Sequence, residues 1–111
     1  MKELDDYIIP PHHIGFKAKP LLLKEEGKGV DCFLAYIEPE GGGPQTDHTH
    51  THDHLFIVIE GVATIYIEGE VNEIGEGQSL LVDGSVKHSV WNKSKSQLKM
   101  IGINLYNDQK A

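Results

Sequence analysis

The sequence contains no arginine, since all ten of its basic residues are lysines, and these stand against 17 aspartates and glutamates. Without a guanidinium group the chain has no rigid fork for holding a carboxylate or a phosphate through two parallel hydrogen bonds. The formal net charge of -7 also disfavours nucleic acid, whose binding depends on clustered basic side chains that release counterions. We therefore expect neither nucleic acid nor a strongly anionic molecule as a partner.

Cysteine occurs once, as Cys32, which excludes an intramolecular disulfide and a metal site built from several thiolates. Its apolar surroundings favour a small buried hydrophobe over a reactive thiol. Long apolar runs are lacking too, and the opening residues Met1–Asp6 are acidic where a secretion signal needs a basic stretch and then an apolar one. We expect a cytoplasmic protein that does not interact with a membrane.

The chain does have enough apolar sequence for one packed core. Its 111 residues are 39% hydrophobic and 24% charged, as in ordinary globular domains, and leave no room for a second core. No helical period is sustained, whereas short apolar or alternating runs recur between Gly, Pro and Asn, the pattern of a β-sandwich or barrel. The predicted strands are Ala18–Lys24, Asp31–Ile37, Leu55–Glu60, Val62–Glu68, Val71–Ile74, Ser79–Val82, Lys87–Trp91 and Leu98–Leu105.

Turn-forming residues separate these strands. Glu68–Glu70 and Gly75–Gly77 are typical of tight turns. The segment Glu38–Pro44 contains three consecutive glycines and predicts a longer loop that no regular element accommodates.

The first part of the chain differs from the rest. Residues 1–17 contain Pro10 and Pro11 and little periodicity, which predicts an N-terminal arm on the surface or an edge segment given to a partner subunit. Residues 18–111 then form the barrel domain. We expect His12 and His13, which lie in the arm, to be an exposed polar pair with no role in a metal site.

A run of histidines is the strongest chemical signal. The run His48-Thr49-His50-Thr51-His52-Asp53-His54 places four of the seven histidines at alternate positions, which share one face in an extended chain. Neutral imidazole is the commonest nitrogen ligand of first-row divalent ions. A histidine-rich tract alone supports a solvated polar loop equally well.

The sequence around this run resembles the first of two motifs of the cupin superfamily, G-x5-H-x-H-x3-E-x6-G. The motif maps onto Gly42, His48, His50, His54 and Gly61 with every spacing kept, and histidine stands where the family usually has glutamate.

The second family motif, G-x5-P-x-G-x2-H-x3-N, maps onto Gly77, Asp83, Ser85, His88 and Asn92. The first glycine, the histidine and the asparagine agree, while the proline and the second glycine do not. Both departures fall in Asp83-Gly84-Ser85, which supplies turn-forming chemistry of its own. Together the two motifs span nearly half of the chain.

The resemblance implies an all-β fold, a small single-domain cupin with a double-stranded β-helix, or jelly-roll-like, barrel. It also implies one divalent transition-metal ion held by four histidines, namely His48, His50, His54 and His88. Imidazole ligands alone do not distinguish iron, manganese, nickel, zinc and copper. We expect His52 to have an outer-shell or pocket-rim role, or an acid–base role, rather than to bind the metal directly.

Further residues around the site are interpreted less specifically. Asp47 and Asp53 either orient ligand imidazoles or are solvated loop acids. Aromatic side chains in so small a chain are expected in the core more than in a pocket, with Trp91 on the face of its strand opposite His88. These aromatic residues are Phe33, Tyr36, Phe56, Tyr66 and Trp91.

Two functional hypotheses follow. The first is a metal-dependent enzyme of the oxygenase, isomerase or lyase type that acts on a small, weakly charged organic molecule. The alternative is a non-catalytic cupin that binds or senses a small molecule and carries a structural metal, because one fold supports both. We also expect a homodimer, with the apolar segment Pro20–Leu23 as a candidate for pairing across subunits.

Overall fold

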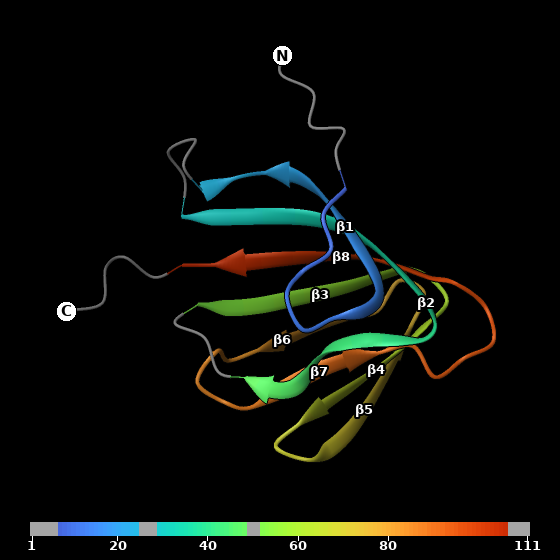
Figure 1. Ribbon diagram of the computed structural model, residues 1–111. Helices are drawn as coiled ribbons and strands as arrows, with labels where there is room; N and C mark the ends of the chain where they lie inside the picture. Colours follow the sequence, from blue (N-terminus) through green and yellow to red (C-terminus); the bar gives the residue numbers. More distant parts are fainter. Residues whose placement is uncertain (1–6, 25–28, 49–51, 107–111) are drawn as a thin grey trace.

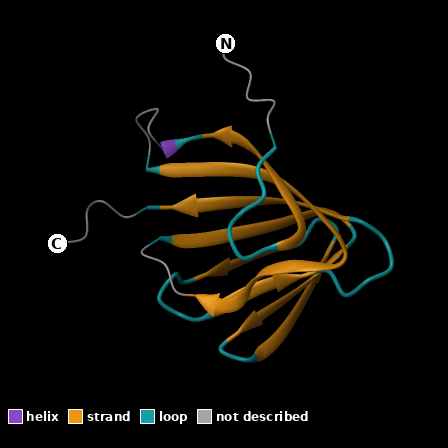
Figure 2. Ribbon diagram, in the orientation of Figure 1, coloured by secondary structure: helices purple, strands orange, loops and turns teal. Residues whose placement is uncertain are grey.

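The computed structural model of the chain describes residues 7–24, 29–48 and 52–106, and these are nearly all in strands (Figures 1 and 2). The strands are β1 (Ile14–Leu22), β2 (Val30–His48), β3 (Asp53–Glu60), β4 (Val62–Ile67), β5 (Glu70–Gly75), β6 (Ser79–Val82), β7 (His88–Trp91) and β8 (Leu98–Leu105). The all-β prediction is therefore confirmed, as are the eight strands and both tight turns. Within the described ranges no helix has the length and apolar character needed to cross a membrane.

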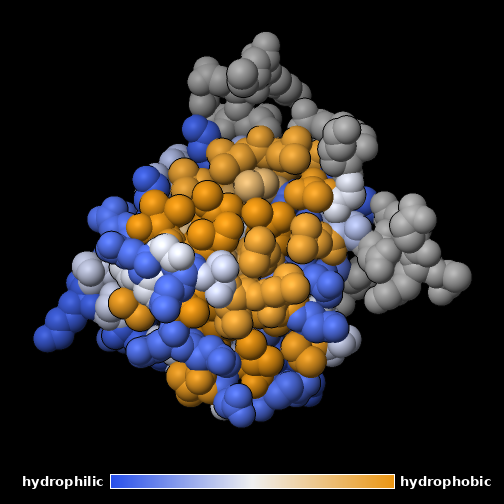
Figure 3. All heavy atoms as spheres, turned by 180° about the vertical axis from the view of Figure 1, so that it is seen from behind, coloured by the Kyte–Doolittle hydropathy of each residue, from blue (hydrophilic) through white to orange (hydrophobic). Residues whose placement is uncertain are grey.

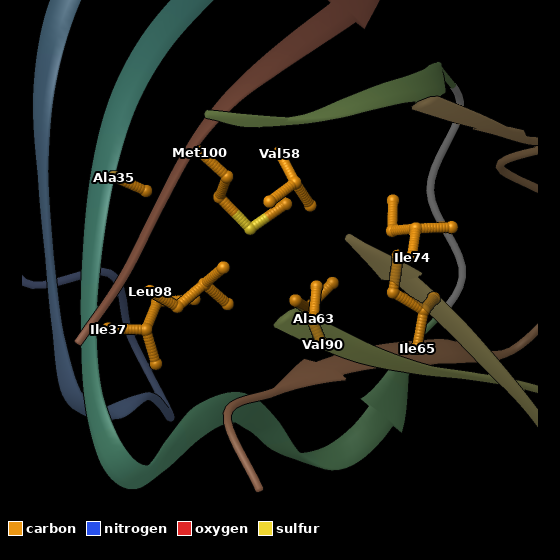
Figure 4. Packing of buried hydrophobic residues seen from close by; sticks show 9 residues of the cluster. All are labelled: Ala35, Ile37, Val58, Ala63, Ile65, Ile74, Val90, Leu98 and Met100. Atoms are coloured by element: carbon orange, nitrogen blue, oxygen red, sulfur yellow. The ribbon is translucent and has the colours of Figure 1, made fainter. Parts of the chain in front are cut away.

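The strands form one antiparallel sheet that curls into a barrel. Their order is β5-β4-β7-β2-β8-β3-β6, and β1 pairs with β2 beside this path. The long strand β2 joins the two halves of the sheet, one formed by β7, β4 and β5 and the other by β8, β3 and β6. Its residues Val30–Ile37 pair with β8, whereas its later residues pair with β7. Figure 4 shows the enclosed apolar core, which is made by Ala35, Ile37, Val58, Ala63, Ile65, Ile74, Val90, Leu98 and Met100. This architecture confirms the expected jelly-roll-like barrel.

The prediction of a loop over Glu38–Pro44 is wrong, since the whole segment belongs to β2. Gly42 has a φ of 148° and lies against the carbonyl oxygen of Val90 and, at 2.7 Å from an added Cβ, the Cα of Trp91. Only glycine permits both this backbone angle and this approach. The glycines thus bend β2 sharply without ending it, and so let one strand serve both halves of the barrel.

The chain before β1 folds back onto its own barrel. Strand β1 begins at Ile14, four residues earlier than predicted, and Ile8 bridges to Ala18 within it. The backbone N–H of Gln45 in β2 donates to the carbonyl of His12 at 2.7 Å. We call residues 8–13 the N-terminal strap, and Figure 1 shows it in blue, crossing in front of β8 and β3.

We predict that Gly43→Ala displaces the strap. The φ of Gly43 is 151°, and a Cβ there would lie 2.7 Å from the His13 ring and 2.9 Å from the His12 carbonyl oxygen. Overpacking of this kind costs about 1–3 kcal/mol, in addition to the backbone cost of alanine at a positive φ. Gly69→Ala is the matched control, because Gly69 has a φ of 81° and nothing within 4 Å of an added Cβ. Thermal unfolding that gives equal losses for the two variants would contradict the packing of the strap on Gly43.

Candidate functional site

A cavity of about 520 Å³ lies between the N-terminal strap and the inner faces of β2, β3, β7 and β8. This volume is in the range of about 300–1,000 Å³ usual for small-molecule sites. Most of its wall is apolar, and its largest apolar side chains are Phe16, Phe33, Phe56, Val90 and Met100. Among the described residues, no Asp, Glu, Lys, Ser or Thr lines it. The polar part of the wall consists of histidines and Asn104.

Three of the histidines stand in a row along one wall. The His54 and His88 ring centroids are 4.7 Å apart, and those of His52 and His54 are 4.8 Å apart. His54 lies on β3 and also stacks on Phe56, at 5.4 Å with the planes within 7°. The barrel therefore brings imidazoles from two separate strands into direct contact at the cavity.

A hydrogen bond to the backbone just before β7 fixes the orientation of the His88 ring. Its Nδ1 lies 2.9 Å from the carbonyl oxygen of Val86, and the side chain is only 3% exposed. Because a carbonyl oxygen can only accept a hydrogen bond, the proton is on Nδ1 and the ring lone pair is on Nε2. A backbone carbonyl that fixes the tautomer in this way is the usual partner of a metal-binding imidazole. The donor set thus fits a transition metal.

Beyond His52, the row of rings continues to a hydrogen-bonded network. The Tyr106 ring lies 4.6 Å from that of His52, and its hydroxyl donates to Asp31 at 2.7 Å. The same carboxylate accepts hydrogen bonds from the backbone N–H of Lys24 at 2.6 Å and from Asn104 Nδ2 at 3.4 Å. Asp31 thereby connects Asn104, which lines the cavity, with Tyr106, which packs on His52.

These contacts set the protonation states. Burial by itself would raise the pKa of Asp31, but its hydrogen bonds outweigh burial and hold the pKa below its ordinary value. Burial, together with the hydrogen bond and charge of Asp31, raises the pKa of Tyr106 to about 12. Burial also lowers the pKa of His52, partly offset by the negative charge of Asp31. At neutral pH the network consists of a carboxylate, a phenol and a neutral imidazole.

Comparison with known proteins identifies the fold family. The sequence pattern of the family described as "Cupin domain" matches residues 33–104, well over half of the chain. The chain belongs to the cupin superfamily. Among curated proteins, this cupin is 33% identical over 67 residues to a mannose-1-phosphate guanylyltransferase of Salmonella montevideo. That match covers 60% of the cupin but only 14% of the guanylyltransferase.

Solved structures show the same barrel. The polyketide cyclase RemF from Streptomyces resistomycificus matches with a TM-score of 0.78 and 16% identity, over 96% of this cupin and 80% of RemF. The Cupin_2 domain of an XRE family transcriptional regulator from Enterobacter cloacae matches with a TM-score of 0.76 and 21% identity. That match covers 85% of this cupin and 99% of the domain. At these identities the likeness shows the fold alone.

The structure shows the positions of only some of the expected metal ligands. It brings His54 and His88 together, and the register of β2 and β7 pairs the backbone of His48 with that of His88. The side chain of His48 and the whole of His50 lie outside the described residues. Within the part of the chain that is described, no group of three or more His, Cys, Asp or Glu could hold a metal ion. The four-histidine site therefore stays a prediction.

The histidines of the arm differ from the expectation. His12 is exposed as predicted, but His13 is half-buried, and both line the cavity. His13 packs edge-on against Phe16 at 4.7 Å, and its Nδ1 lies 2.7 Å from the carbonyl oxygen of Pro11. Sequence reasoning missed this because Pro10 and Pro11 suggest an extended arm, whereas here they bend the strap over the barrel.

Asp53 and the aromatic residues also have defined places. Asp53 accepts a hydrogen bond from the backbone N–H of Gly84 at 3.0 Å, and so anchors the turn after β6 instead of orienting an imidazole. Asp47 has its side chain outside the described residues. Phe33 and Phe56 line the cavity. Phe56 also packs against the core, as expected, whereas Phe33 does not belong to the core cluster. Trp91 lies on the face of β7 opposite to that of His88, as predicted. Its Nε1 donates to the Ser89 hydroxyl on that face at 3.0 Å.

We predict that Asp31→Asn destabilises this cupin at neutral pH. Hydrogen bonds to a charged acceptor contribute about 1.5–3 kcal/mol, so the loss should be of this size. Because the folded-state pKa of Asp31 is lowered, its contribution is present above the unfolded value of about 4 and is lost as the pH falls through the folded value. The gap between the variant and the wild type should therefore close in acid.

Urea unfolding at neutral and acidic pH measures this gap. Glu38→Gln is the control, since Glu38 is exposed and its carboxylate accepts a hydrogen bond from Gln97 at 2.6 Å at the surface. Exposed pairs contribute little. A gap for Asp31→Asn that persists unchanged below the ordinary carboxyl pKa would show that its effect is steric.

Proposed function

We propose that this cupin binds one divalent transition-metal ion through His48, His50, His54 and His88. We further propose that it is a metal-dependent enzyme acting on a small, uncharged or weakly charged organic molecule in the cavity. The contact between His54 and His88 at the wall of a mostly apolar cavity carries this proposal. A site of this kind suits iron, nickel, copper or zinc, and manganese is compatible as well.

The bound metal would act as a Lewis acid that polarises a substrate oxygen, and its charge would not be reduced by four neutral ligands. The protein residues hold and shield the substrate. Phe33, Phe56 and Met100 offer the substrate an apolar surface, and residues of the N-terminal strap line the cavity as well. The lack of ionised side chains in the described lining favours a substrate without a full charge.

His52 is the residue that we assign to proton transfer. It lines the cavity beside His54, and its lowered pKa keeps the imidazole neutral and able to accept a proton at neutral pH. The Tyr106 ring packs against His52 on the other side. His52 can therefore serve as the base that the missing family glutamate does not provide.

The alternative is a cupin that binds or senses a small molecule without changing it. The same barrel occurs in the cupin domain of a transcriptional regulator, and one fold supports both catalysis and binding. In this second reading the metal is structural. Elemental analysis of untagged protein, purified without added metal, tests the metal shared by both readings. A screen of neutral aromatic and aliphatic alcohols, aldehydes and ketones for turnover then separates the two.

His54→Glu is the variant that distinguishes catalysis from binding. The family accepts glutamate here, so we expect the variant to fold and retain its metal. The added negative charge lowers the Lewis acidity of the metal, and turnover should fall by about tenfold or more, which corresponds to about 1.4 kcal/mol of transition-state stabilisation. A binding protein with a structural metal would keep its ligand affinity. Loss of the metal with the fold intact would contradict the assumed ligand set.

A further inference from the structure

The inner face of β2, β8 and β3 is built from rows of paired residues, because cross-strand partners point to the same side of a sheet. Three neighbouring rows run from the polar end of the cavity to the apolar core. They consist of Asp31, Asn104 and His54; of Phe33, Gly102 and Phe56; and of Ala35, Met100 and Val58. Figure 4 shows the side chains of the third row pointing into the barrel. The second row therefore lies between the histidines and the core.

The centre of the second row has no side chain. Gly102 lines the cavity between Phe33 on one neighbouring strand and Phe56 on the other. The residues before and after it, Ile101 and Ile103, point to the outside of the barrel, which Figure 3 shows from behind with many hydrophobic residues on its surface. Strand β8 thus carries large side chains on its outer face beside Gly102 and leaves a gap on its inner face.

The backbone does not require a glycine at this position. The φ of Gly102 lies outside the left-handed region, and among the described residues an added Cβ would meet only the Phe56 ring, in ordinary van der Waals contact at 4.0 Å. Gly42 and Gly43 differ, since their φ values and close contacts exclude a side chain. Glycine is less favourable than alanine inside a strand and often marks the close approach of a ligand. An occupant of the cavity therefore explains the gap over Gly102 better than the fold does.

We propose that an aromatic ring of the substrate lies over Gly102, between Phe33 and Phe56. This inference rests on the proposed function, because it names the class of molecule that the same cavity binds. Neighbouring strands are about 4.8 Å apart, so the strands that carry the two phenylalanines are about 10 Å apart, with Gly102 midway between them. A ring over Gly102 can then approach both phenyl rings at the centroid distances of about 4.5–7 Å that aromatic pairs prefer. A side chain at position 102 would take this space.

The rows on either side of Gly102 set the direction in which the molecule lies. Asn104 and His54 are one row away, about 7 Å along the strands, and the Asn104 amide can donate a hydrogen bond to a substrate oxygen beside the proposed metal ligand. Met100 is one row away on the other side, and a thioether sulfur makes favourable contacts with aromatic rings. The substrate class is therefore a neutral aromatic molecule with an oxygen substituent, whose oxygen faces the histidines and whose ring faces the core.

Calorimetric titration of the metal-free, full-length protein with 2-naphthol tests the proposal. We expect the wild type to bind 2-naphthol, and to bind it more tightly than its saturated counterpart, decahydro-2-naphthol. Gly102→Val should weaken the affinity for 2-naphthol by about tenfold or more, because the added methyl groups occupy the place of the ring. Gly75→Val is the matched control and should bind like the wild type. Gly75 is also a strand glycine without a positive φ, an added Cβ there would lie 3.7 Å from Gln78 Oε1, and it does not line the cavity.

Phe33→Leu keeps the test decisive if Gly102→Val fails to fold. It removes one aromatic partner, and should weaken 2-naphthol binding by about two- to tenfold while the affinity for decahydro-2-naphthol stays nearly unchanged. An unchanged affinity of Phe33→Leu for 2-naphthol would overturn the proposal. So would a wild type that does not bind 2-naphthol or binds both probes equally, or a folded Gly102→Val protein that binds 2-naphthol like Gly75→Val. Because no metal is present, these results do not depend on the metal site, which elemental analysis tests separately.

Discussion

Replacement of His88 by alanine is expected to abolish metal binding while the barrel remains folded. His88 is the second-motif ligand, and its Nδ1–H is already committed to the Val86 carbonyl, which orients the ring. Loss of an outer-shell partner alone costs about 10- to 100-fold in metal affinity, and loss of a ligand should cost more. The His88→Ala protein should keep all of the strand pairing that encloses the core, because that pairing is made by the backbone.

Thermal unfolding with and without added metal measures the loss. At a metal concentration of a hundred times the dissociation constant, the wild type should gain about 2.7 kcal/mol, whereas His88→Ala should gain nothing. The gain of the wild type should fade below about pH 6.5, because protons compete with the metal for imidazole. His12→Ala is the control, since His12 lines the cavity but lies outside both family motifs. Metal stabilisation that survives in His88→Ala would contradict the proposed site.

Asn92→Ala should give the largest loss of stability. Asn92 is fully buried, and its Nδ2 donates to the carbonyl oxygens of Ile37 at 2.9 Å and Ser96 at 2.8 Å. Its Oδ1 accepts hydrogen bonds from the N–H and the hydroxyl of Ser94. Each buried polar group that is left without a partner costs about 1–3 kcal/mol, so a total loss of about 3 kcal/mol or more is expected. The side chain ties β2 to the loop between β7 and β8.

Urea unfolding of Asn92→Ala and Asn72→Ala separates this role from a general effect of removing an amide. Asn72 makes one long contact, 3.4 Å from its Nδ2 to the Glu70 carbonyl oxygen, and its loss should cost less than about 0.5 kcal/mol. Asn92→Asp would place a carboxylate oxygen against the Ile37 and Ser96 carbonyl oxygens in a buried position, so it should cost at least as much as Asn92→Ala. Similar losses for Asn92→Ala and Asn72→Ala would contradict a structural role for the family asparagine.

Local pattern was sufficient to predict most of the fold. Alternating and apolar runs marked the strands because each strand has an inner face that must be buried. The extension of β2 could not be predicted, because glycines such as Gly42 usually end strands and only the pairing with β7 shows that they bend one here. The contact of His54 with His88 was expected from the resemblance to the two cupin motifs, and local propensity alone would not have predicted it.

The hydrogen-bonded network of Asp31 and Tyr106 could not be predicted from the sequence, for a physical reason. Asp31 and Tyr106 are 75 positions apart, and they meet only because β2 and β8 pair in one register. A shift of one residue in this register would turn the side chains of the shifted strand to the opposite face. Asn104 could have been placed on the face of Met100 by alternation in β8, but not beside the histidines. His13 was likewise missed, since nothing local shows where the strap returns to β2.

The long strand β2 has a consequence for how the chain folds during synthesis. Its first half has β8, the last strand, as a neighbour, and β8 in turn separates β2 from β3. Before Leu98–Leu105 has been made, β2 and β3 have no shared neighbour and the inner faces that carry the histidines cannot enclose a cavity. Pairings between such distant segments form slowly, because a large loop must close before any contact is gained. Folding of the barrel and assembly of its site should therefore both wait for the synthesis of β8 and be nearly simultaneous.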